Sequence, residues 1–156
     1  MHRNRQGFTI LELITVMVIS TVLAGIVTVS FSRVQGQLGV QSAQSNFLSL
    51  HAQARAFASE RGTMVFFVVD DADDEFRVEW VNPDSGEREV LNSVSVGREF
   101  NVNVSASESG AQLCFTPRGI ADPGCNTFTG TLRVELVRAN RSASLLVLQL
   151  GQAREA

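Results

Sequence analysis

The sequence lacks lysine and tyrosine, and it contains only two histidines and two cysteines among its 156 residues. A nucleophilic triad needs a histidine, but His2 lies at the very start, and His51 lies on a predicted helix that implies no nucleophile beside it. Neither a glycine-rich phosphate loop nor the Cys/His spacing of a metal site occurs. We therefore expect a protein that is not an enzyme, with no catalytic residue, no cofactor and no metal site. We interpret His51 as a residue at the surface or rim of a helix.

Arginine is the only basic type, and its 13 residues face 16 acidic ones, which gives a net charge of −3. A net negative charge is unfavourable for nonspecific binding to the phosphates of nucleic acid, so we do not expect nucleic acid as a partner. The acids cluster in the run DDADDE, where Asp70, Asp71, Asp73 and Asp74 could bind calcium. Because the run lacks the glycine and the final glutamate of an EF-hand loop, an ordinary acidic hairpin loop is favoured.

A run of twenty uncharged residues, from Leu13 to Ser32, is long enough as a helix to span a bilayer. Arg3 and Arg5 precede it and favour a cytoplasmic N-terminus, which places the C-terminal domain outside the bacterial inner membrane. A secretory signal peptide and a plain signal anchor are the alternatives. An anchor explains the charge and the length, but it leaves Gly7 and Glu12 unexplained.

The stretch GFTILE at the start of this run resembles the leader junction of type IV pilins and pseudopilins. By this resemblance, a prepilin peptidase cuts between Gly7 and Phe8 and methylates the new amino group of Phe8. Glu12, the fifth residue of the mature chain, would then pair with the amine of a neighbouring subunit in a helical fibre. The alternative for Glu12 is a position in the first helical turn, where the helix dipole favours an anion.

The polar stretch after Ser32 keeps a helical spacing of apolar residues. This spacing predicts one apolar stripe made of Val34, Leu38, Phe47, Leu50, Ala54 and Phe57. Gly36 and Gly39 predict a bend or soft spot, and Gly62 predicts the C-terminal cap. We thus expect a leader at 1–7, a transmembrane and assembly helix at 8–32, an amphipathic helix at 33–61 and a β-rich domain at 62–156.

Beyond Gly62 the apolar residues alternate with a period of two, as in β-strands. The pattern predicts strands at 63–69, 76–81, 100–105, 131–137 and 144–150, with a turn at 82–86. The last strand is apolar on both faces, which predicts a central strand covered on each side. The expected fold is therefore α+β, a long N-terminal helix packed on an antiparallel β domain of one or two sheets.

Cys114 and Cys125 would pair if this domain lies outside the cytoplasm, and the short loop they close would add about 2 to 3 kcal/mol of stability. Two buried free thiols are the alternative. Arg118, in the segment CFTPRG, either contacts a neighbouring subunit or simply lies beside the turn that Pro117 and Gly119 make.

The segments LHAQARAFASERGTMVFFV and CFTPRG are similar to the GspH/FimT group of minor pilins and pseudopilins. This resemblance implies a minor pseudopilin of a type II secretion system, with a minor pilin of a type IV pilus as the alternative. Implied partners are a prepilin peptidase, other pilins or pseudopilins, the inner membrane and exported protein cargo. Some pilus members end in Gly-Arg-x-Arg and bind DNA, but this chain has only Arg154 of that pair, so DNA binding is not expected. A membrane-tethered enzyme and an anchored module that never polymerises are the other classes.

Overall fold

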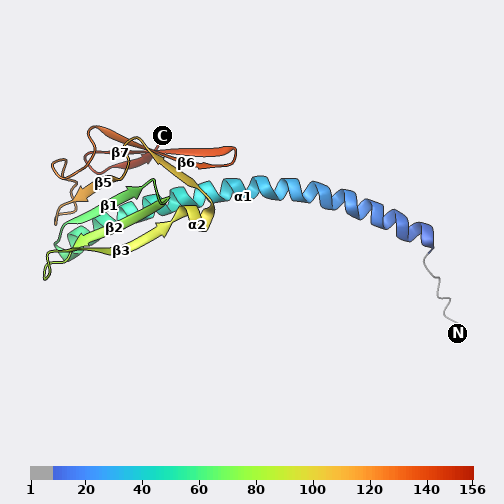
Figure 1. Ribbon diagram of the computed structural model, residues 1–156, viewed down its shortest axis with the longest axis horizontal. Helices are drawn as coiled ribbons and strands as arrows, with labels where there is room; N and C mark the ends of the chain where they lie inside the picture. The colour runs from blue at the N-terminus through green and yellow to red at the C-terminus, as the bar shows by residue number, and fades with distance from the viewer. Residues whose placement is uncertain (1–8) are drawn as a thin grey trace. The chain divides into compact units, whose positions relative to one another are not determined.

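The computed structural model describes residues 9–156, without the side chains of residues 26–33. The chain forms two compact units, residues 1–35 and residues 36–156. The elements, drawn in Figure 1, are α1 (Ile10–Arg61), β1 (Val65–Asp70), β2 (Glu75–Val81), β3 (Arg88–Ser95), α2 (Val96–Phe100), β4 (Asn103–Ala106), β5 (Ala111–Phe115), β6 (Thr131–Arg138), β7 (Arg141–Leu148) and β8 (Ala153–Glu155).

The described part of the first unit is the beginning of α1. Thr9 caps this helix, because its hydroxyl oxygen accepts the Glu12 amide at 3.2 Å and its carbonyl accepts the Leu13 amide at 3.2 Å. Among the described residues, no helix is both long and apolar enough to cross a membrane. Residues 26–32 of the predicted transmembrane run lie in the segment whose side chains are not described.

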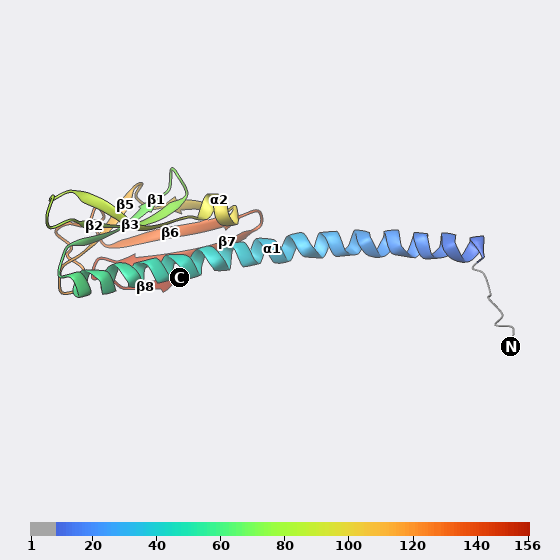
Figure 2. The same cartoon turned by 90° about the horizontal axis from the view of Figure 1, so that it is seen from below.

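The second unit contains two antiparallel sheets of four strands each. The first has the order β3-β2-β1-β5 and the second the order β4-β6-β7-β8. The part of α1 in this unit and both sheets contribute to one apolar core, in which Phe47 of α1 meets Phe67 and Phe76 edge-on at 5.0 and 5.1 Å between ring centroids. Figure 2 shows this part of the helix running along the sheets. The predicted α+β fold is confirmed, and it has two sheets.

The buried face of α1 differs from the predicted stripe at its start. Its buried side chains are those of Val40, Ala43, Phe47, Leu50, His51, Ala54 and Ala58. Val34 and Leu38 are more than half exposed, so their assignment to the stripe was wrong. At about 100° per residue they lie roughly half a turn from Phe47, whereas Gly36 and Val40 lie on the same side as Phe47.

The two helix glycines do not interrupt α1, which continues to Arg61. Gly39 is buried where α1 passes close to the end of α2. A Cβ at this position would lie 3.0 Å from the carbonyl oxygen of Phe100, so only glycine fits without a shift. Gly62 ends the helix as predicted: its φ is 64° and its amide donates to the carbonyl oxygen of Ala58.

The predicted strands at 63–69, 76–81 and 131–137 correspond to β1, β2 and β6. The strand predicted at 100–105 was partly wrong, because α2 extends to Phe100 and the left-handed Asn101 turns the chain before β4. The strand predicted at 144–150 is β7, which ends at Leu148. β7 is an inner strand of its sheet, but only one face is fully buried, at Leu145 and Val147.

Candidate functional site

The predicted processing site, Gly7 and Phe8, lies outside the described residues. Glu12 is described and lies exposed in the first turn of α1, three residues after the capping Thr9. An acid at this position is favoured by the helix dipole, which is the simpler of the two roles expected for Glu12. This placement is compatible with the assembly role too, because the carboxylate is open to a neighbouring molecule.

The helix around Glu12 exposes apolar side chains on every side. Ile10 is 81% exposed, and the other large apolar residues up to position 23 are each more than half exposed: Leu11, Leu13, Ile14, Val16, Met17, Val18, Ile19, Val22 and Leu23. Soluble proteins rarely expose a contiguous apolar surface of this extent, and such a surface marks contact with a membrane or with other proteins. This surface, residues 10–23, is therefore the main candidate site for assembly.

Cys114 and Cys125 form a disulfide in the second unit, with their Cα atoms 5.8 Å apart. The chain around the disulfide is tightly held: the Asp122 amide donates to the Cys114 carbonyl at 3.0 Å, and the Cys114 amide donates to the side chain of Asn126 at 2.9 Å. The loop is therefore a fixed feature of the surface beside β5.

Arg118 lies exposed at the tip of this loop, in a turn closed by the Gly119 amide donating to the Thr116 carbonyl at 2.8 Å. Gly119 has a φ of 70° and a Cβ there would lie 3.2 Å from the Arg55 carbonyl, so the turn rests directly on α1. A pocket of about 420 Å³ is lined by residues 116–118 and 120–123. Arg118 and the exposed Ile120 thus lie on a rigid turn, where another subunit could reach both side chains.

His51 does not lie at the surface or rim, so that interpretation was wrong. It is 8% exposed and its ring lies between Phe67 and Phe115, at 5.7 and 5.5 Å between ring centroids. Burial, and then the charge of Arg55, lowers the pKa of His51 from its ordinary 6.5 to about 4. No described residue offers Nε2 a hydrogen-bond partner. The imidazole is a neutral member of the core, and its neighbours come from β1 and β5, which the spacing of α1 residues does not reveal.

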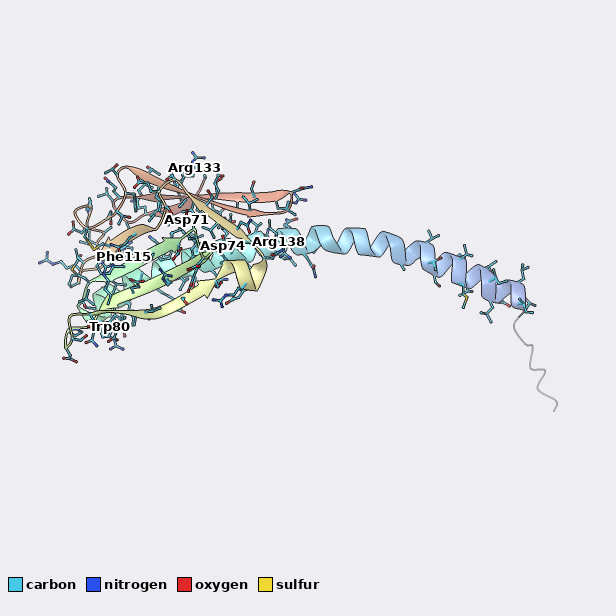
Figure 3. All side chains as sticks on the ribbon, in the orientation of Figure 1. Asp71, Asp74, Trp80, Phe115, Arg133 and Arg138 are labelled. Carbon is cyan, nitrogen blue, oxygen red and sulfur yellow. A yellow bond between two sulfur atoms is a disulfide. The ribbon has the colours of Figure 1, made fainter. Side chains whose placement is uncertain are left out.

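The acidic run forms the turn between β1 and β2 as predicted, but two of its acids, Asp71 and Asp74, bind distant parts of the chain. Figure 3 labels both acids. Asp74 Oδ1 accepts the Val104 amide of β4 at 2.6 Å. Asp71 Oδ1 accepts the Ser109 hydroxyl at 2.7 Å and the Gly110 amide at 3.1 Å, and these two bonds lower the pKa of Asp71. Among the described residues, no group of three side chains is arranged to bind a metal ion. Asp74 thus ties this turn of the first sheet to β4 of the second, and Asp71 ties it to the loop between β4 and β5.

Comparison with known proteins bears on both the N-terminal segment and the fold. Residues 2–28 match the family model of the prokaryotic N-terminal methylation motif. The structure is similar to the type IV minor pilin FimU of Pseudomonas aeruginosa strain PAO1, crystallised in space groups P21 and P65. The P21 form has a TM-score of 0.57 at 15% identity and covers 77% of this chain and 90% of that chain. The P65 form has a TM-score of 0.52 at 16% identity, with 74% and 91% covered.

The chain has a type IV pilin-like fold. No curated protein matches its sequence. In this pilin-like chain the methylation motif covers Gly7, Phe8 and Glu12, and it implies processing by a prepilin peptidase and assembly with other pilins. The long N-terminal helix fits a membrane-anchored component of a pilus. The motif ends before the second unit begins, so the disulfide loop and Arg118 lie outside it.

Proposed function

We propose that the protein is a minor, non-enzymatic subunit of a pilin-like fibre. A prepilin peptidase cleaves it between Gly7 and Phe8 and methylates Phe8. The mature chain stays in the inner membrane through residues 8–32, with its β-rich domain on the extracytoplasmic side, until the helix joins a fibre. The observation that carries this proposal is the all-round apolar surface at residues 10–23 with a single acid, Glu12, in its first turn.

Both the membrane and the fibre would cover this surface. Each removes apolar side chains from water, which is worth roughly 25 cal/mol for every Å² buried. In the membrane, a carboxylate near a helix end costs about 1 to 3 kcal/mol. In the fibre, the amino group of Phe8 from one subunit neutralises Glu12 of the next. Assembly therefore relieves a cost that the single subunit bears, and the charge pair sets the register of neighbouring helices.

The replacement Glu12→Gln tests this role of the acid. We expect it to leave the amount of membrane-bound subunit unchanged and to reduce its share in sheared fibres at least about tenfold, which corresponds to about 1.4 kcal/mol. Glu60→Gln is the matched control, because Glu60 is an exposed acid near the other end of α1. If the Glu12 variant enters fibres as well as the control does, the assembly role of Glu12 is wrong.

Two machines fit a minor subunit of this kind. The sequence resemblance to the GspH/FimT group favours a type II secretion pseudopilus, in which the β-rich domain would face other pseudopilins or exported cargo. The fold similarity to FimU favours a minor pilin of a type IV pilus. Deletion of the gene in the native host separates them: loss of protein export with intact pili assigns the pseudopilus, and loss of surface pili or twitching with normal export assigns the type IV pilus.

A further inference from the structure

We draw no further inference here: the strongest candidate, the surface patch around the pocket of residues 116–118 and 120–123, where Arg118 and Ile120 are exposed beside the disulfide loop, carries none because nothing in the described part of the structure shows what covers it.

Discussion

His51 lies in the core between α1 and the first sheet, where its charged form is disfavoured. The folded state holds a neutral imidazole with a pKa of about 4, whereas the unfolded chain binds a proton near pH 6.5. Between these two values the unfolded state binds more protons, so stability falls as the pH falls from 6.5 to 4. The helix stripe did not indicate this, because a histidine is equally common at a surface.

We expect the folded protein in detergent to lose about 3 kcal/mol more of its free energy of unfolding between pH 7 and pH 4 than His51→Leu does. The variant is the reference because it removes the titrating group and keeps an apolar side chain in the core. Denaturant unfolding at the two pH values measures the difference. Parallel losses in both proteins would mean that the folded state does not depress the pKa of His51.

Asp74 connects the acidic turn to the second sheet through its bond with the buried Val104 amide. Asp74→Ala should lower the free energy of unfolding by about 1 to 3 kcal/mol, since the amide loses its acceptor. Asp74→Asn should recover most of the loss, because asparagine keeps an acceptor oxygen and tolerates the φ of 50° found here. Asp73→Ala in the same turn should stay within about 0.5 kcal/mol of the native protein. Equal losses at positions 73 and 74 would contradict the role of the Val104 bond.

At the scale of elements, the two glycines of α1 differ in what surrounds them. Gly36 has room for a Cβ, whereas a Cβ on Gly39 would meet Arg138 and the Phe100 carbonyl. Gly36→Ala should therefore raise the free energy of unfolding by about 0.5 to 1 kcal/mol through helix propensity, and Gly39→Ala should lower it by about 1 kcal/mol or more. Thermal melts of the two variants show whether each change raises or lowers the stability of the protein. If both substitutions raise the free energy of unfolding, α1 does not lie against the Phe100 carbonyl of α2 at Gly39.

The sequence predicted the elements whose residues repeat with a clear period. The alternation of β1, β2 and β6 and the spacing of α1 after residue 40 appear directly in the structure. β3 was missed because it is an edge strand with mostly exposed side chains, and β8 because it has only three residues and exists by pairing with β7. The start of the buried stripe was misplaced since exposed and buried apolar residues look alike in a sequence.

The candidate sites, too, were predictable where a local motif carries them and not where they depend on distant residues. Glu12 and the apolar run were found because a motif of adjacent residues carries them. The contacts of Asp71 and Asp74 join residues at least 30 positions apart, and the environment of His51 comes from two strands that the helix alone does not reveal. Such long-range partners depend on how the sheets pack, which no local pattern records.

At the scale of the whole molecule, the protein combines a helix with an exposed apolar surface and a β-rich domain that has its own core. The domain is self-sufficient in its packing, with a disulfide and acid-to-amide bonds that fix its loops. The N-terminal part of the helix is not packed in this way, because its apolar surface at residues 10–23 is exposed. A membrane-held subunit that later joins a fibre accounts for this division, and it requires maturation at the N-terminus.

The most direct test of that maturation is the intact mass and N-terminal sequence of the protein extracted from membranes of its native host. The account predicts a mature chain that begins at Phe8 and carries one additional methyl group. A chain that still begins at Met1, or one cleaved near Gly25, would contradict it. The N-terminal segment would then be an anchor or a signal peptide, and the assembly role of Glu12 would be lost.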